Sequence, residues 1–250
     1  MADELIKPTP ASDRSALDAQ AADRSRRAQA RSAEWLAAAL ALIAGFVDAY
    51  GMITYGVYVS FMSGNTTQTG YQTAEGAFGP ASLSALAILF FVVGSFAGTL
   101  LAHFAGRHGR RVVFGAVAAA LTAIVVLRAQ GFVAAGAHIP TISFAMGIMN
   151  CALSRVGAQA VSLTFVTGAL SRIGSSLALA LRRAPLHDAE GPWDTHLRRA
   201  LLLALLWLGF LVGAFLSGAV TPRYGAPVLA VPALILALLA AFDRPEAAAG

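Results

Sequence analysis

Long apolar runs, separated by short polar segments, dominate the chain from about residue 35 onward. Each run approaches the roughly 20 residues that an α-helix needs to cross about 30 Å of hydrocarbon. The pattern therefore predicts six membrane-spanning helices. The uncharged or nearly uncharged runs are residues 35–55, 81–104, 112–127, 139–154, 200–220 and 226–242.

Two further stretches, residues 57–74 and 157–181, are apolar enough to enter a membrane but rich in Gly, Ser and Thr. If both were full spans, the chain would cross eight times and the basic turn at residues 106–111 would lie outside, against the positive-inside rule. We therefore predict that both stretches are broken or re-entrant and add no crossing.

The loop charges predict the orientation of these spans. Lys and Arg are concentrated before residue 33, in the turn at 106–111 and in the loop at 182–199, whereas the other connections carry no more than one Arg each. Because basic loops mark the cytoplasmic face, both termini are expected in the cytoplasm. The predicted organisation is a disordered charged cytoplasmic tail (1–33), two membrane repeats (34–128 and 138–242) and a cytoplasmic tail (243–250).

Composition supports the membrane class. Hydrophobic residues make up 57% of the 250 residues and charged residues only 12%, which excludes an ordinary soluble domain and a disordered chain. The net charge of +5 could suggest nucleic acid, but the basic residues lie in short runs between apolar stretches, as in membrane proteins. A single cysteine, Cys151, excludes an intrachain disulfide.

The two halves of the chain resemble each other. SFMSGNTTQTG (60–70) aligns with TFVTGALSRIG (164–174), GFVDA (45–49) with GIMNC (147–151), and GSFAG (94–98) with GAFLSG (213–218). Each half holds three spans, an odd number, so the second half must be inverted. We predict an all-α membrane protein of two inverted three-helix repeats, an architecture of many secondary transporters with sites near the membrane midplane.

The string GFVDAYGMITYGVYVSFMSGNTTQTG and the later AMGIMNCALSRVGAQAVSLTFVTGALSRIG resemble the YoaK-like family of small bacterial membrane proteins, a domain of unknown function. The resemblance covers about residues 35–242. It implies a multi-span protein of the bacterial cytoplasmic (inner) membrane and supplies no activity.

Three charges lie within the apolar part: Asp48, Arg155 and Arg172. At 1.5 Å per residue, Asp48 and its repeat counterpart Asn150 fall near the midplane, and Arg172 about 15 Å from the cytoplasmic surface. Intramembrane charges usually face a cavity or a partner, so we favour Asp48 and Arg172 over Arg155, which can snorkel. Asp48 is either a carboxylate that couples proton or cation movement or half of a structural ion pair with Arg172.

The broken stretches are the second candidate region. A half-helix beginning there would expose backbone N–H groups suited to an anionic group, and the alternative is close packing of small residues, as predicted for Gly94 and Gly98. GSFAG is also one candidate face for a homodimer. The polar candidates in the two breaks are Ser63, Asn65, Thr66, Thr67 and Thr167.

No signature of a hydrolase, metalloprotease or nucleotide-binding enzyme appears, and His138, His187 and His196 show no metal-ligand spacing. We therefore expect no catalysis, cofactor or metal. The sequence favours a transporter or channel for a small polar or anionic solute, with coupling by Asp48 and Asn150 as its neutral counterpart. The alternative is a membrane scaffold or sensor whose buried polar residues are structural. The expected partners are the lipid bilayer, a small solute or ion and a second copy of the chain, and not nucleic acid.

Overall fold

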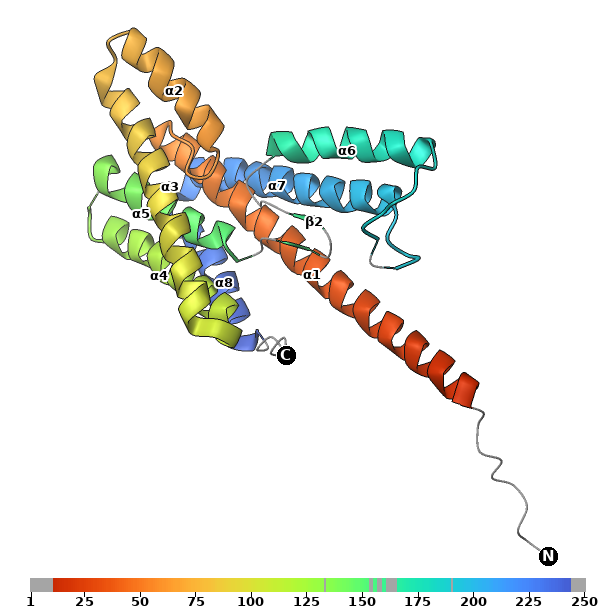
Figure 1. Ribbon diagram of the computed structural model, residues 1–250. Helices are drawn as coiled ribbons and strands as arrows, with labels where there is room; N and C mark the ends of the chain where they lie inside the picture. The colour runs from red at the N-terminus through yellow and green to blue at the C-terminus, as the bar shows by residue number, and fades with distance from the viewer. Residues whose placement is uncertain are drawn as a thin grey trace, which may run out of the picture.

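The computed structural model describes residues 11–132, 134–152, 155–156, 159–160, 166–189 and 191–243, and it is helical apart from one short antiparallel strand pair (Figure 1). The helices are α1 (Ala11–Tyr55), α2 (Met62–Ala74), α3 (Phe78–Ala105), α4 (Gly109–Ala129), α5 (Ala135–Asn150), α6 (Val166–Leu181), α7 (His196–Tyr224) and α8 (Ala230–Phe242). The short elements are the 3₁₀ turns η1 (Gly106–His108) and η2 (Ala226–Leu229) and the strands β1 (Arg155–Val156) and β2 (Gln159–Ala160).

The first helix differs from the expected disordered tail. Residues 11–33 are helical and continue into the first span, so that α1 is 45 residues long and its N-terminal part extends away from the other helices (Figure 1). Alanine-rich sequence favours a helix, and Asp23 forms an i,i+4 ion pair with Arg27 at 2.9 Å. Tertiary contacts also stabilise the N-terminal part of α1. Trp193 donates a hydrogen bond to Asp23 at 3.2 Å, and Arg198 forms an ion pair with Glu34 at 2.6 Å.

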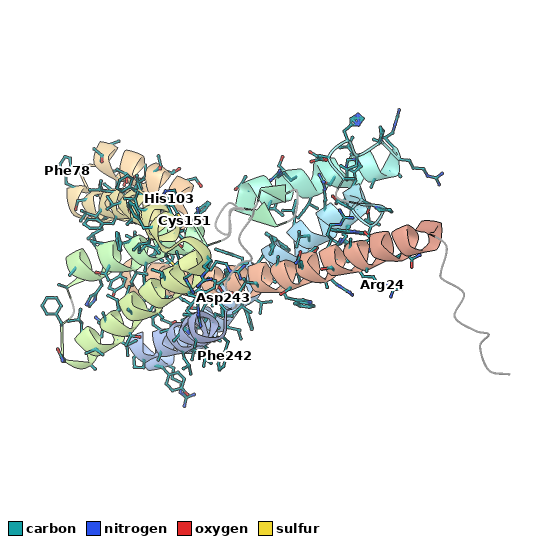
Figure 2. All side chains as sticks on the ribbon, turned by 60° about the horizontal axis from the view of Figure 1, so that its bottom comes forward. Arg24, Phe78, His103, Cys151, Phe242 and Asp243 are labelled. Atoms are coloured by element: carbon teal, nitrogen blue, oxygen red, sulfur yellow. The ribbon has the colours of Figure 1, made fainter. Side chains whose placement is uncertain are left out.

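Helices cover the predicted spans. Three helical stretches of the described chain are long and apolar enough to cross a membrane, namely Gln20–Tyr55, Phe78–Ala129 and His196–Tyr224, and the second of these contains both α3 and α4. Many large apolar side chains point outward, among them Phe78 and Phe242, which Figure 2 labels. Exposed apolar surface of this extent is typical of a protein that faces lipid.

The chain is interrupted near the first Gly/Ser/Thr-rich stretch, as predicted, but the break spans residues 56–61, whereas residues 63–67, which were expected to form it, lie inside helix α2. Helix α1 ends at Tyr55, and Gly56 has a φ of +71°, a conformation that favours glycine. The chain then turns back beside α1 before α2 begins at Met62 and packs against α3. In the second stretch, α6 follows the β1–β2 pair, but residues 157–158 and 161–165 lie outside the described chain, which leaves the Thr164 end of the repeat alignment untested.

Two helix crossings depend on glycine. At the α1–α7 crossing, a Cβ on Gly45 would overlap the carbonyl oxygen of Phe210, and a Cβ on Gly213 would overlap that of Leu42. Because glycine has no side chain, the backbones of the two helices come into direct contact. Because Gly209 lies against Ala38 and Gly213 against Leu42, residue numbers rise together and the two helices run parallel.

The α3–α5 crossing has the same arrangement. A Cβ on Gly94 would overlap the carbonyl oxygen of Phe144, and a Cβ on Gly147 would overlap that of Phe91. Gly98 also abuts Ile148, so these helices run parallel as well. The GSFAG segment, expected as a candidate homodimer face, therefore packs its glycines within the chain, because Gly94 and Gly98 are buried against α5.

The buried core joins α1, α4, α5, α7 and α8. Helix α4 packs along α8, and two arginines at its start hold the end of α8. Arg110 contacts Asp243 through two hydrogen bonds of 2.6 and 3.2 Å, and Arg111 donates to the carbonyl oxygens of Ala240 and Ala241. These bonds place the start of α4 and the end of α8 at the same end of the molecule.

Candidate functional site

Asp48 is the one acidic residue among the buried side chains of the described chain, with 4% of its surface exposed. It lies on α1, two turns before that helix ends. Its Oδ1 accepts hydrogen bonds from the backbone N–H groups of Val59 at 2.9 Å, Ser60 at 2.7 Å and Phe61 at 3.3 Å. These three amides directly precede the first residue of α2, so the carboxylate acts as a remote cap on that helix.

This contact changes the prediction for the break. The break does present backbone N–H groups at the start of a half-helix, as expected, but the anionic group that occupies them is the carboxylate of Asp48 itself. The predicted alternative of an ion pair between Asp48 and Arg172 is also wrong for this structure, because Arg172 is an exposed residue of α6. A carboxylate that accepts several amide hydrogen bonds needs no arginine partner.

Asn65 is fully buried and fixes the shape of the break. Its Oδ1 accepts from the backbone nitrogen of Tyr58 at 3.1 Å, and its Nδ2 donates to the carbonyl oxygen of Tyr58 at 2.6 Å. One amide side chain thus satisfies both backbone groups of a residue that belongs to no helix. Since both ends of its amide are engaged with the backbone, Asn65 positions the break.

The hydroxyl residues of α2 lie on its exposed side. Thr66 donates to the carbonyl oxygen of Met62 and Thr67 to that of Ser63, each bond returning one turn along the same helix. Ser63, Thr66 and Thr67 are all exposed. These three side chains therefore lie on the surface of the protein, whereas Asp48 is buried.

A cluster of aromatic and polar side chains lies where the end of α1 meets the start of α5. The hydroxyl of Tyr55 lies 2.9 Å from Nδ1 of His138, and the rings of Tyr50 and Phe132 each lie about 6 Å from this pair, between ring centres. His138 is 1% exposed. We call Tyr50, Tyr55 and His138 the buried polar cluster.

Two polar atoms of the buried polar cluster make no well-aligned hydrogen bond among the described residues. They are the Tyr50 hydroxyl, whose polar neighbour is Tyr55, and Nε2 of His138. Buried polar groups are normally paired, with protein or with water. These two atoms, on side chains that both pack against Tyr55, therefore mark a place suited to water or a polar ligand.

Sequence reasoning missed this cluster. Spacing rules reject His138 as a metal ligand, and its partner Tyr55 is 83 positions away, at the end of a different helix. The available signal was an ionisable side chain just before an apolar run, which would have marked His138 as a residue needing a partner.

The remaining predicted residues lie on other elements than Asp48. Asn150 is the last residue of α5 and is half-buried, and Thr167 is exposed in the first turn of α6. Arg172 lines a pocket of about 240 Å³ between α6, α7 and the segment that joins them. The side chain of Arg155 lies outside the described residues.

No group of three or more His, Cys, Asp or Glu that could hold a metal ion is found in the described ranges. Among the described residues, the buried polar side chains instead carry hydroxyl, amide and imidazole groups and one carboxylate. Such groups can bind water, a proton or a small polar molecule.

The comparisons with known proteins agree with this architecture. Residues 36–242 match the family described as "protein of unknown function (DUF1275)". The chain is also 31% identical over 215 residues to the UPF0700 transmembrane protein RA0705 of Rhizobium meliloti (strain 1021), an alignment that covers 84% of this chain and 87% of the relative. No solved structure matches the chain. The chain therefore belongs to the DUF1275 family, a family of transmembrane proteins that includes YoaK.

Proposed function

We propose that this protein is a transporter or channel for a small polar solute, and that the solute passes the buried polar cluster. The observation that carries the proposal is that two buried polar atoms beside Tyr55, the Tyr50 hydroxyl and Nε2 of His138, make no well-aligned hydrogen bond among the described residues. Leaving such an atom unsatisfied costs about 1–3 kcal/mol. A polar path used by water or solute explains why apolar residues do not fill these positions.

Asp48 supplies the coupling step in this proposal. Its charged carboxylate holds the start of α2 through three amide hydrogen bonds. Hydrogen bonds to an ionised acceptor are about twice as strong as neutral ones. Binding of a proton or cation to Asp48 therefore weakens the attachment of α2 to α1 and links the charge state of Asp48 to the conformation of the break.

The two glycine crossings support the inverted-repeat architecture. In both, each glycine abuts the carbonyl oxygen of the residue three positions before its partner glycine. The repeat alignment relates Gly45 to Gly147 and Gly213 to Gly94, and thereby relates one crossing to the other. A rotation that exchanges the halves would produce this reciprocity, with Asn150 in the place of Asp48.

The contacts also support six spans with both termini in the cytoplasm of a bacterium. With six spans, the end of α1 and the start of α5 lie at the same membrane face, as the Tyr55–His138 hydrogen bond requires. With eight spans, the end of α1 and the start of α5 would lie at opposite membrane faces. The Arg110–Asp243 bonds likewise join the C-terminal end, which six spans place in the cytoplasm, to the basic turn, which charge assigns to the cytoplasmic face. We assign no catalytic activity to this arrangement.

A screen for ligands tests the proposal. Thermal unfolding of the purified protein in detergent would be followed with sodium, potassium, alanine, glutamate and glucose for wild type, Tyr55→Phe and His138→Gln. Thr67→Ala, on the exposed side of α2, is the matched control. A compound at about 100 times its Kd adds about 2.7 kcal/mol of stability. Uptake of the radiolabelled hit into proteoliposomes then measures transport.

We expect a compound that stabilises wild type and Thr67→Ala but not the two cluster variants, and that wild type carries into liposomes. If no compound stabilises wild type and the cluster variants are only less stable, the transport proposal is wrong. The scaffold alternative then gains support from the contacts that join the α1 extension to the loop before α7, namely Asp23–Trp193 and Glu34–Arg198.

A further inference from the structure

Arg128 places a positive charge beside the buried polar cluster. It lies in the last turn of α4 and interacts electrostatically with both Tyr55 and His138. The chain then turns, with the Gly131 nitrogen bonded to the Arg128 carbonyl oxygen at 3.0 Å and a Gly131 φ of +83°. After this turn, the ring of Phe132 lies 6.1 Å from that of His138, between ring centres. The end of α4 therefore brings a guanidinium and an aromatic ring to the same cluster.

The charge of Arg128 is not balanced at the cluster. No carboxylate of the described chain is among the groups that act electrostatically on Tyr55 or His138. The half-buried side chain of Arg128 forms no ion pair or hydrogen bond with the described residues. Asp48, two turns before Tyr55 on α1, is engaged by three backbone amides. The surroundings of the cluster are therefore positive.

The hydrogen bond within the cluster leaves a second donor free. The phenol hydroxyl of Tyr55 is more acidic than the N–H of a neutral imidazole, so Tyr55 donates to Nδ1 of His138 at 2.9 Å. The neutral ring then carries its hydrogen on Nε2, the buried atom without a well-aligned partner among the described residues. A protonated ring would also present a donor there. An N–H donor close to a guanidinium is an arrangement that binds an anion.

We propose that the solute bound at the buried polar cluster is a small carboxylate. The guanidinium of Arg128 binds its two oxygens in the bidentate geometry that arginine favours, and Nε2–H of His138 donates to one of them. The rings of Tyr50, Tyr55 and Phe132, packed edge to face, suit the short apolar part of such a molecule. This assignment rests on the proposed function, because it names the chemical class of the solute at the same site.

Thermal unfolding with three matched ligands tests the assignment. The full-length protein in detergent would be titrated at about pH 8, where a carboxylic acid is fully ionised, with sodium acetate, acetamide and sodium chloride. Acetamide has the shape of acetate without its charge, and chloride has the charge without the two oxygens. The variant is Arg128→Gln. The matched control is Arg223→Gln, because Arg223 also lies in the last turn of a long helix but is exposed beside Tyr224.

We expect acetate to raise the melting temperature of wild type and of Arg223→Gln by about 2–4 °C. Acetamide and chloride should leave both melting temperatures unchanged. Arg128→Gln should weaken acetate binding at least about tenfold, since it removes a bidentate charged contact.

Three results would overturn the assignment: no shift of wild type with acetate, an equal shift with acetamide or chloride, or an unchanged acetate shift in Arg128→Gln. If Arg128→Gln does not give monodisperse protein, Arg128→Lys is measured instead. Lysine keeps the charge but not the two-pronged geometry, so an acetate affinity equal to wild type would contradict the role of Arg128.

The carboxylate assignment and the transport proposal can fail separately. If wild type carries a neutral or cationic solute into liposomes and does not respond to acetate, transport stands and the carboxylate assignment is wrong. If acetate binding depends on Arg128 but no bound compound is taken up into liposomes, the carboxylate site stands and the transport proposal is wrong.

Discussion

Oδ1 of Asp48 lies 2.7 Å from the backbone nitrogen of Ser60, twelve residues later in the chain. The chain must reverse after Tyr55 to bring these atoms together, and the same oxygen also accepts from Val59 and Phe61. A side chain of the first span thus caps a helix that follows a break. The contact joins the charge state of one residue to the position of α2.

Removal of the Asp48 carboxylate should destabilise the protein. Asp48→Ala leaves three buried amides without their acceptor, and we expect a loss of about 2–5 kcal/mol in the free energy of unfolding. Asp48→Asn keeps an acceptor oxygen and loses only the charge, so its loss should be about 1–2 kcal/mol. Denaturation in detergent measures both, and equal losses would show that the hydrogen bonds contribute little.

Asn65 should tolerate no substitution that removes either end of its amide. Asn65→Ala deprives both backbone groups of Tyr58 of their partner, which we expect to cost about 2 kcal/mol. Asn65→Asp keeps the acceptor but sets a carboxylate against the carbonyl oxygen of Tyr58, and should cost at least as much. Melting temperatures would be compared with Thr67→Ala, which should lie within about 0.5 kcal/mol of wild type. If Asn65→Ala left the stability unchanged, the proposed role of Asn65 in holding Tyr58 would be wrong.

The two glycine crossings should respond alike to an added methyl group. Gly213→Ala and Gly147→Ala each place a Cβ into the backbone of the neighbouring helix, and we expect each to cost about 2 kcal/mol or more. Gly218→Ala is the matched control on α7, because nothing lies within 4 Å of its Cβ, and alanine there should stabilise the helix by about 0.5–1 kcal/mol. Thermal unfolding of the three variants checks this ordering, which a tolerated Gly213→Ala would contradict.

The joining segment before α7 should loosen only in acid. Hydrogen bonds from Arg199 hold the pKa of the Asp188 carboxyl below its usual range. A lowered pKa in the folded state means that the pair stabilises the protein above about pH 3.9, the unfolded value, and is lost as the pH falls through the folded value.

The melting temperature of wild type relative to Asp188→Asn measures this dependence. The difference between the two proteins should stay constant from about pH 8 to pH 5 and shrink below about pH 4. A difference that shrinks already between pH 7 and pH 5 would show that Asp188 is not the group responsible.

Several features of the fold follow from the sequence because they depend on local properties. Helices cover the predicted spans since apolar length is read along the chain, and the Gly/Ser/Thr-rich composition predicts an interruption in this region although it misplaces the break at residues 63–67, which are helical. The extension of α1 through residues 11–33 was missed, because charge suggested disorder while alanine content and contacts with Trp193 and Arg198 favour a helix.

The sequence by itself determined the membrane class, the apolar helices and the importance of Asp48, because hydropathy and the cost of a buried charge are properties of short segments. Only the tertiary structure decided what each polar side chain contacts. Asp48 meets backbone amides and not Arg172, Asn65 holds Tyr58, and His138 meets Tyr55 across 83 positions. A hydrogen bond requires its donor and acceptor to lie within about 3 Å of each other. Which groups come that close depends on how the chain reverses and how the helices pack, and local sequence does not determine either.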